Sequence, residues 1–290
     1  MKCYLCPKKC GQERSEVVGK GACKMPTKLK IAKYQLFDFE EPCISVGKGS
    51  GAIFFSGCNL NCVFCQNYEI SSLGNGKFLS QDDFINIIKE LEVMGAENIN
   101  LVSPMHYATQ IVSALKKYKP KVPVIYNTNA YESEETIKMV APFVDVFLPD
   151  FKYYSSNISN MFSFVPDYME VALKSIKLMR SLKKDIYDQN GKILEGVIIR
   201  HMILPLCTED SCKVLETIKN EIPNTKVSLM AQYTPYGRAS EFKAINRKIT
   251  PKEYNKVLNK FNELELDGYT QGLESANTKF IPSFTNNGQI

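Results

Sequence analysis

From residue 51 onward, the chain alternates between short apolar runs and longer segments in which apolar residues recur every three or four positions. The short runs predict β-strands, and the longer segments predict amphipathic α-helices. After Ser80, for example, Phe84, Ile87, Ile88 and Leu91 fall on one helical face. The predicted strands cover residues 52–56, 98–102, 122–126, 144–148, 197–204 and 227–230. The predicted helices cover residues 80–95, 108–117, 134–140, 168–182, 208–218 and 250–264.

Residues at the ends of these segments support the predicted boundaries. Ser80 and Thr208 are expected to cap the helices that follow them by accepting hydrogen bonds from free backbone amides. Gly95 ends the first of these helices. Residues 250–253, Thr-Pro-Lys-Glu, form a capping box with proline at the first helical position. Residues 188–191, Asp-Gln-Asn-Gly, predict a hairpin turn just before the fifth strand.

Six strands, each followed by a helix or a long loop, predict a parallel sheet with the helices on its outer side. We therefore expect an α/β fold, a partial (β/α)6 TIM-like barrel that is open on one side, with a small N-terminal cysteine-rich metal-binding appendage. Ligands in such folds bind at the carboxyl ends of the strands. The expected parts are the appendage (1–26), a connector with a short strand or hairpin in residues 30–41 (27–50), the barrel (51–266) and a C-terminal extension (267–290).

The composition narrows the class of protein. Hydrophobic residues make up 44% of the 290 residues and charged residues 23%, as in ordinary globular proteins. The net charge of +5 comes without a dense Lys/Arg tract, which disfavours nucleic-acid binding. The start, MKCYLCPKKC, lacks the apolar centre of a signal peptide, and no apolar run is long enough for a bilayer, so no membrane partner is expected. Ten cysteines then favour metal ligation in a reducing cytoplasm over disulfides.

The candidate chemistry centres on residues 54–67, FFSGCNLNCVFCQN, directly after the first predicted strand. Cys58, Cys62 and Cys65 have the spacing C-x3-C-x2-C. Thiolates are the ligands of iron–sulfur clusters, and a cubane cluster normally takes four of them. Three local thiolates would leave one iron of a [4Fe–4S] cluster with an open position, where chemistry can occur. A structural zinc or a redox site with the same spacing is the alternative.

This motif, with Phe64 just before its last cysteine, resembles the radical S-adenosylmethionine superfamily. The surrounding text GSGAIFFSGCNLNCVFCQN and the residues at later strand ends resemble the pyruvate formate-lyase activating enzyme homologues within it. The resemblance extends from about residue 3 to residue 284. It implies a radical oxidoreductase that holds a [4Fe–4S] cluster and S-adenosyl-L-methionine, with Phe64 among the cofactor-binding residues.

The resemblance also implies a reaction. In such enzymes an electron cleaves S-adenosylmethionine to methionine and a 5′-deoxyadenosyl radical, which abstracts a hydrogen atom from the substrate. The preferred interpretation is an activase of a glycyl radical enzyme that receives electrons from a reductant such as flavodoxin or ferredoxin. The first alternative is radical modification of another peptide, protein or small molecule. An alternative of another class is a non-catalytic iron–sulfur electron carrier or a zinc-binding nucleic-acid module.

Two polar segments at strand ends are similar to segments of the activating enzymes. Asn127, Thr128 and Asn129 stand where those enzymes have Asp-Thr-Asn, a segment that helps to hold a monovalent cation beside the cofactor carboxylate. Asn127 removes one charge, so the presence of that cation is left open. Asp150 and Lys152 lie in a Pro-Asp-Phe-Lys segment that resembles their Leu-Asp-Leu-Lys. Lys152 is expected to pair with the cofactor carboxylate, and Asp150 to bind the cation or orient Lys152.

Other strand-end residues are assigned with less help from the resemblance. Ser103 stands where radical enzymes usually carry Gly-Gly-Glu, so its hydroxyl and nearby backbone carbonyls would replace a carboxylate on the methionyl amino group. Arg200 lies in a strongly apolar run and needs an anion, for which we expect the methionyl carboxylate. An internal ion pair is the rival for Arg200. His106, Gln232 and Tyr233 are the candidate substrate-side residues.

A second cysteine group stands at the N-terminus with the spacing C-x2-C-x3-C-x12-C, and its members are Cys3, Cys6, Cys10 and Cys23. Four cysteines close a coordination sphere, which predicts an accessory metal site holding either structural zinc or a second iron–sulfur cluster. Similar N-terminal cysteine groups occur in relatives of the activating enzymes. Cys43 stands alone, and burial of a small thiol is its preferred interpretation. Cys207 and Cys212 are five residues apart at a helix start, where packing is preferred and a redox or accessory ligand role is the alternative.

Overall fold

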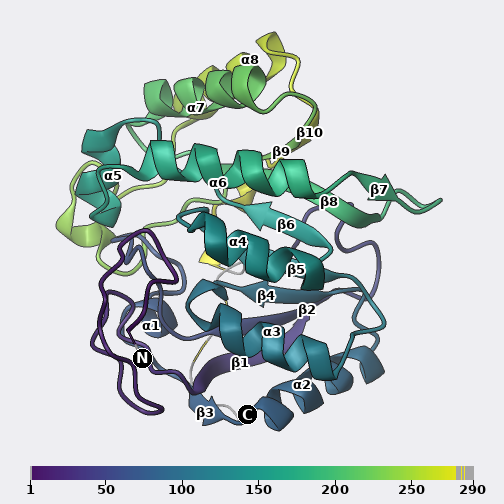
Figure 1. Ribbon diagram of the computed structural model, residues 1–290. Helices are drawn as coiled ribbons and strands as arrows, with labels where there is room; N and C mark the ends of the chain where they lie inside the picture. The colour runs from purple at the N-terminus through teal and green to yellow at the C-terminus, as the bar shows by residue number, and fades with distance from the viewer. Residues whose placement is uncertain (1, 279–281, 283, 285–290) are drawn as a thin grey trace.

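The structure is a computed structural model that describes residues 2–278, 282 and 284. Its central element is one curved sheet (Figure 1), whose strands follow the order β10-β9-β8-β6-β5-β4-β2-β1-β3, with β7 paired to β8. The strands of the described chain are β1 (Leu29–Phe37), β2 (Ser50–Phe55), β3 (Lys77–Leu79), β4 (Ile99–Val102), β5 (Val124–Thr128), β6 (Val146–Pro149), β7 (Ile186–Tyr187), β8 (Ile193–Met202), β9 (Lys226–Met230) and β10 (Gly268–Thr270).

Strands β2, β4, β5, β6, β8 and β9 are parallel and lie side by side in the order of the chain. They correspond to the predicted strands and confirm the partial barrel. In the described residues β2 pairs onward with β1, and β9 with β10, so the row is open rather than closed. The register places Val102 beside Asn127 and Thr128 beside Pro149. The polar residues that follow these strands are therefore brought to one edge of the sheet.

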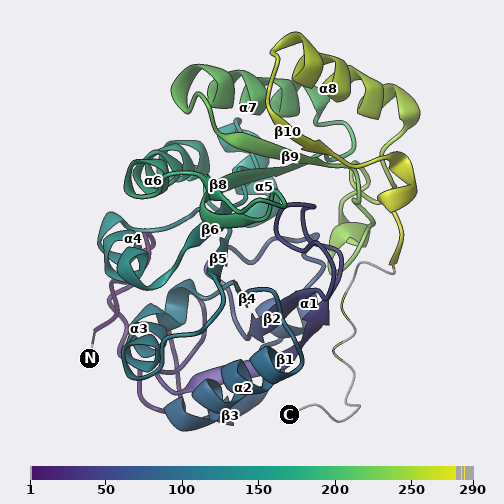
Figure 2. The same ribbon diagram turned by 90° about the vertical axis from the view of Figure 1, so that its right-hand side faces the viewer.

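Helices cover the outer side of the sheet, and Figure 2 shows α2, α3, α4 and α6 in a row along it. The α-helices are α1 (Tyr68–Ser71), α2 (Gln81–Val93), α3 (Ala108–Lys117), α4 (Glu134–Val140), α5 (Ser156–Ser163), α6 (Tyr168–Leu182), α7 (Thr208–Glu221) and α8 (Pro251–Glu263). Short 3-10 turns cover Met105–Tyr107, Ala141–Phe143, Ala239–Glu241 and Leu273–Ser275. Since the apolar faces of the helices pack on the sheet, the cysteine loop and the other strand ends are held in a rigid frame.

The predicted caps are confirmed at two helices and wrong at a third. Ser80 accepts a hydrogen bond from the amide of Asp83, and Thr250 does the same for α8 in the predicted capping box. Thr208 is not a cap: it is the first helical residue of α7, and Cys207 before it makes no side-chain cap hydrogen bond. The predicted hairpin at residues 188–191 is confirmed, since β7 and β8 are antiparallel across this turn.

The segment between β1 and β2, residues 38–49, crosses the amino-terminal ends of the parallel strands. Asn98, just before β4, donates its side-chain amide to the carbonyl of Ile44 (2.9 Å). The amide of Ile193, at the start of β8, donates to the carbonyl of Cys43 (2.8 Å). Because β2 ends in the cysteine loop and begins beside this segment, the segment lies at the opposite end of the barrel. We call residues 38–44 the floor segment.

The N-terminal segment packs around the cysteine loop. Arg14 is buried and donates to three backbone carbonyls, those of Met25 (2.9 Å), His106 (2.7 Å) and Pro26. The side chain of Met25 fills the space over Gly57, where a Cβ would overlap it. Gly57 has a φ of +88°, which glycine adopts readily, and it immediately precedes the first cysteine of the loop. The backbone entering the cysteine loop is thus shaped in part by residues 14–26.

In the part of the chain that the structure describes, no helix combines the length and the apolar character that crossing a membrane requires.

Candidate functional site

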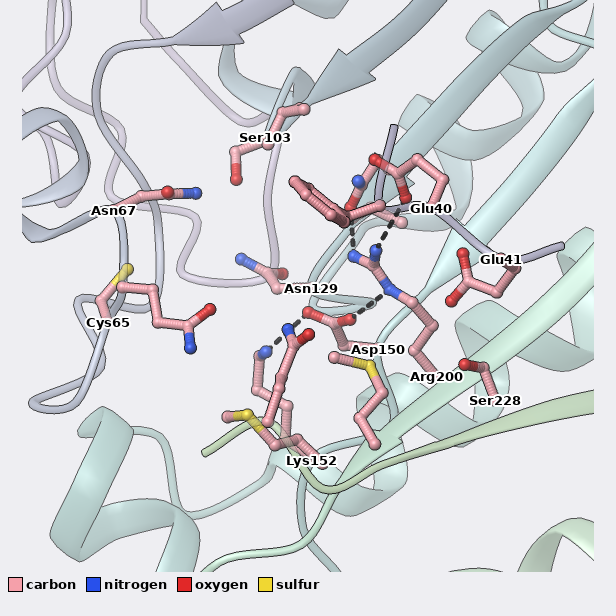
Figure 3. A pocket seen from close by; sticks show the side chains of 18 of the residues that line it. Glu40, Glu41, Cys65, Asn67, Ser103, Asn129, Asp150, Lys152, Arg200 and Ser228 are labelled. Carbon is pink, nitrogen blue, oxygen red and sulfur yellow. Dashed lines mark hydrogen bonds and ion pairs between the residues drawn. The ribbon is translucent and has the colours of Figure 1, made fainter. Parts of the chain in front are cut away.

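A cavity of about 550 Å³ lies inside the curved sheet, between the cysteine loop and the floor segment. Its size is typical of sites for small molecules and cofactors. Figure 3 shows Cys65 and Asn67 on one side of it and Glu40, Glu41 and Arg200 on the other. The predicted site residues that line it are Cys58, Cys62, Phe64, Cys65, Ser103, Asn127, Thr128, Asn129, Asp150, Lys152, Arg200 and Gln232.

Three cysteine sulfurs face this cavity from the loop between β2 and α1. The loop turns tightly, since the amide of Cys65 donates to the carbonyl of Cys62 (3.2 Å) and Asn61 has a left-handed φ of +63°. Every sulfur accepts a side-chain hydrogen bond: Cys58 from Asn129 (3.3 Å), Cys62 from Ser163 (2.9 Å) and Cys65 from Ser71 (3.2 Å). Donors of this kind stabilise negative charge on sulfur.

The electrostatics of the loop favour a metal cluster as its partner. Burial raises the pKa of Cys62, and burial together with the neighbouring Cys62 raises the pKa of Cys65 to about 12. Three thiolates here therefore need a compensating positive charge such as a metal centre.

The placement of the sulfurs also fits a cluster. Among the described residues, no three His, Cys, Asp or Glu side chains are arranged as ligands of one metal ion. A [4Fe–4S] cluster does not need such convergence, because each thiolate binds a different iron. Cys58, Cys62 and Cys65 are also the only described cysteines that line the cavity, so a fourth thiolate ligand is absent from its described wall. The residues present fit a cluster with one iron free of protein ligands.

A charged group stands across the cavity from the cysteines. Asp150 binds Lys152 through Oδ2 (2.6 Å from Nζ) and Arg200 through Oδ1 (3.0 Å from Nε). Burial alone would raise the pKa of Asp150, but Lys152 and Arg200 outweigh it and hold that pKa below its ordinary value. Arg200 also donates from Nη2 to Oδ1 of Asn127 (2.5 Å). The oxygens expected to bind a monovalent cation are thus engaged by the protein's own cations.

Two acidic residues of the site were missed in the sequence. Glu40 lies with its Oε2 atom 3.7 Å from Nη1 of Arg200 and accepts a hydrogen bond from Asn100 on β4 (2.7 Å). Glu41 lines the same cavity. The available signal was Arg200, whose charge in an apolar strand requires anions that the chain itself can supply. Arg200 makes the internal ion pairs that its rival interpretation expects.

The strand-end residues Ser103, Thr128 and Asn129 hold the cavity wall in shape. Ser103 has a φ of +56°, a conformation that is strained for serine, and its amide donates to the carbonyl of Asn127 (2.9 Å). Asn129 donates to Oδ1 of Asn59 (2.8 Å) as well as to the Cys58 sulfur. Asn129 therefore links the third predicted strand end directly to the cysteine loop.

Thr128 is anchored by a buried carboxyl group that gives a pH-dependent prediction. Its hydroxyl donates to Oε1 of Glu132 (2.5 Å), while Oε2 has no hydrogen-bond partner in the described chain. Burial raises the pKa of Glu132 from 4.5 to about 7. Between these pH values the unfolded chain has released this proton and the folded chain has kept it, so raising the pH favours unfolding.

We expect Glu132→Gln to be more stable than the wild type above pH 7 by up to about 3 kcal/mol, because the variant buries no charge. The advantage should shrink as the pH falls through 7 and vanish near pH 4.5. Chemical denaturation of both proteins across this pH range measures the difference. The exposed neighbour variant Glu135→Gln should follow the wild type. A Glu132→Gln advantage that does not change with pH would contradict the assignment.

Two of the tentative substrate-side residues do not reach the cavity. His106 is buried beside the N-terminal segment, where its Nε2 lies 2.6 Å from the carbonyl oxygen of Ser56. Tyr233 is also buried, and its hydroxyl donates to the carbonyl of Ile245 (2.7 Å). Gln232 does line the cavity, where it accepts a hydrogen bond from Gln271 (3.1 Å).

The N-terminal cysteines lie outside this cavity. Cys3, Cys10 and Cys23 are close enough to Cys6 to act on it electrostatically, and burial raises the pKa of Cys6 to about 11. The carbonyl of Leu5 accepts hydrogen bonds from Ser133 (3.1 Å) and Thr136 (2.7 Å), which tie this segment to the start of α4. Zinc and a second cluster both stay predictions for this group. Cys43, Cys207 and Cys212 are buried among apolar side chains.

Comparison with known proteins places this site in a family. The family model described as the radical SAM superfamily matches residues 52–205, which is more than half of the chain and includes the cysteine loop, Asp150, Lys152 and Arg200. The uncharacterised protein MJ0674 of Methanocaldococcus jannaschii is 30% identical over 278 residues, which cover 91% of this chain and 75% of that protein.

A solved structure shares the fold. Streptococcus suis SuiB bound to its precursor peptide SuiA has a TM-score of 0.51 at 15% identity, covering 78% of this chain and 51% of SuiB. This chain therefore spans about half the length of SuiB. A domain of a pyruvate-formate lyase-activating enzyme from Bacteroides vulgatus has a TM-score of 0.37 at 16% identity, covering 66% of this chain and 91% of that domain. That score is too low to support a conclusion. From the family match and the cavity that carries its cysteines, we conclude that this chain belongs to the radical S-adenosylmethionine superfamily.

Proposed function

We propose that this protein holds a [4Fe–4S] cluster through Cys58, Cys62 and Cys65, binds S-adenosylmethionine beside it, and abstracts a hydrogen atom from a substrate. The observation that supports this best is the shared cavity, in which three thiols from one loop face a group of paired charges. When bound, the cluster and S-adenosylmethionine supply the electron transfer and the carbon radical that hydrogen abstraction requires. The electron would come from a reductant such as flavodoxin or ferredoxin.

The role of the chain's own residues is to position these groups. Lys152 and Arg200 offer two cations for the carboxylate of the methionyl part, and a guanidinium suits a carboxylate through its paired N–H donors. Asp150 fixes the orientation of both cations through its two oxygens. Asn127 holds the other side of the Arg200 guanidinium. This prior ordering lowers the cost of binding the cofactor in one pose.

An aromatic cluster shields the cysteine loop from water. Phe64 is only 4% exposed, and its ring packs edge-on against Tyr153, Phe162 and Tyr233 at centroid distances of 5.9–6.4 Å. Tyr233, proposed from the sequence as a substrate-side residue, thus supports Phe64 from behind. A dry wall on this side would protect a reactive radical from competing donors.

For the substrate, we propose the glycine of a glycyl radical enzyme. The support is the similarity of the cysteine loop, of Asp150 with Lys152, and of Arg200 to the activating enzymes, together with an open sheet that could admit a loop of a partner protein. The test is anaerobic incubation of the reconstituted, reduced protein with S-adenosylmethionine and each candidate glycyl radical enzyme of the same host. Electron paramagnetic resonance should detect a glycyl radical. Cofactor cleavage without that signal on any candidate would reject the activase and leave the radical chemistry standing.

A second candidate is the radical modification of a different peptide, protein or small molecule. It is favoured by Ser103 and Asn127, which depart from the activating-enzyme pattern, and by the acidic residues Glu40 and Glu41 in the cavity. SuiB, which shares the fold, has been crystallised with a precursor peptide. Mass spectrometry of host peptides after turnover would decide for this candidate if it found a modified residue other than glycine.

A further inference from the structure

The floor segment places two adjacent carboxylates in the cavity. Glu40 has a side chain that is 8% exposed, and Glu41 is 8% exposed as a residue. The backbone around them is fixed, because the carbonyls of Cys43 and Ile44 accept hydrogen bonds from the starts of β8 and β4. Figure 3 shows both glutamates beside Arg200, on the side of the cavity away from Cys65. Their position is therefore set by the sheet and not by a mobile loop.

The charges around the cavity do not balance. Its described lining carries three carboxyl groups, Glu40, Glu41 and Asp150, and only two cations, Lys152 and Arg200. Asp150 has the short contacts to both cations, at 2.6 and 3.0 Å. The Oε2 atom of Glu40 lies 3.7 Å from Nη1 of Arg200, which is longer than a hydrogen bond. Burial and the adjacent Glu41 raise the pKa of Glu40 to about 7, as expected where positive charge is lacking.

Glu41 interacts with Arg200 through its charge but makes no short contact with it. Its Oε2 atom is buried and has no hydrogen-bond partner, and no ion pair to its carboxylate occurs in the described residues. A buried carboxylate oxygen without a hydrogen bond is costly to the fold. Such a cost is typical of a group that is retained for binding and is satisfied only when its ligand is present.

The surroundings favour an organic cation over a metal ion. No described set of three His, Cys, Asp or Glu side chains is arranged for a metal ion. Aromatic residues line the same cavity near the floor segment, namely Phe37, Phe39 and Tyr269. Aromatic faces attract ammonium and guanidinium groups, and their apolar area suits the alkyl stem that carries such a group.

We propose that Glu40 and Glu41 form a subsite for a cationic group of the substrate, an alkylammonium or alkylguanidinium such as the side chain of a lysine or an arginine. The proposal rests on the proposed function only in treating the bound cation as part of a substrate. Binding of a cation at this subsite depends on the floor segment alone. A cation held there supplies the charge missing from the described lining. It would also fix the depth at which a substrate enters the cavity, and hence which carbon lies near the cysteine loop.

The test uses the full chain and small probes of matched shape. Ligand-observed NMR titrations with n-butylammonium, n-butylguanidinium and neutral butyramide compare the wild type with Glu41→Gln. We expect the wild type to bind the two cations about tenfold more tightly than butyramide, a ratio that corresponds to about 1.4 kcal/mol. Glu41→Gln should lose most of this preference. The control Glu263→Gln, an exposed glutamate on α8, should retain it.

Two further measurements keep the result unambiguous. Thermal unfolding of Glu41→Gln should show a melting temperature close to or above that of the wild type, because a buried carboxylate oxygen without a hydrogen bond has been removed. The affinity of the wild type for each cation should be the same with and without saturating S-adenosylmethionine. Absence of any preference, a preference that survives in Glu41→Gln, or competition by S-adenosylmethionine would each overturn the subsite. Because binding needs no turnover, these outcomes are independent of whether the reconstituted protein cleaves its cofactor.

Discussion

Replacing Cys62 with alanine is expected to abolish cluster loading at the cysteine loop and cleavage of S-adenosylmethionine. Cys62 is the most buried of the three loop cysteines, at 8% exposure, and its sulfur is held by Ser163 at 2.9 Å. Loss of a residue that merely supports a metal ligand typically costs about 10- to 100-fold in metal affinity, and loss of a ligand should cost more. Anaerobic reconstitution, iron and sulfide analysis, and 5′-deoxyadenosine formation from reduced protein measure the effect.

The matched control for this variant is Cys212→Ala. Cys212 is buried to the same degree, at 7% exposure, but it lies on α7 in the apolar core and does not line the cavity. It should load iron and cleave the cofactor like the wild type, with only a modest loss of stability. If Cys62→Ala retained wild-type iron content and cofactor cleavage, the assignment of the loop as the cluster site would be wrong.

Replacing Arg200 with glutamine is expected to have the second largest effect, on stability and on cofactor binding together. Its guanidinium is the cation shared by Asp150 (3.0 Å), Glu40 (3.7 Å) and the side-chain oxygen of Asn127 (2.5 Å). Removing one partner of a buried ion pair typically costs about 3–5 kcal/mol, because the other charge is left uncompensated. Denaturant titration should show this loss, and calorimetry should show weaker S-adenosylmethionine binding.

The double variant Arg200→Gln/Asp150→Asn separates these contributions. It removes both members of the pair, so we expect part of the lost stability to return. Cofactor binding should stay weak, because one of the two cations expected to hold the carboxylate is still missing. The control Arg238→Gln, at a partly exposed residue outside the cavity lining, should behave like the wild type in both measurements. A single variant as stable as the wild type would show that the carboxylates find other partners.

The barrel could be predicted from the sequence because its signals are local. Apolar runs such as residues 197–204 and capping residues such as Ser80 act within a few positions of one another, and the structure confirms both. Threonine is a good cap, which predicts that role for Thr208, but Cys207 occupies the N-cap position and Thr208 is the first helical residue. Helix α5 escaped prediction because its eight residues, SNISNMFS, are mostly polar.

The candidate site was predictable only where it lies at the ends of parallel strands. Register alone brings Asn127, Asp150 and Ser103 to one edge. Glu40 and Glu41 enter from the other end of the barrel, and their arrival depends on hydrogen bonds between segments more than 50 residues apart. His106 illustrates the opposite case: it follows a strand as expected, but its ring contacts the carbonyl of Ser56 and does not line the cavity.

The hydrogen bonds of Arg14 bear on whether the N-terminus of the protein can be truncated or tagged. A variant that starts at residue 27 would lack Arg14, which donates to the carbonyl of His106. It would also lack Met25, whose side chain packs over Gly57. Deleting the first 26 residues as dispensable, or replacing them with an affinity tag, would therefore reshape the bend that leads into Cys58.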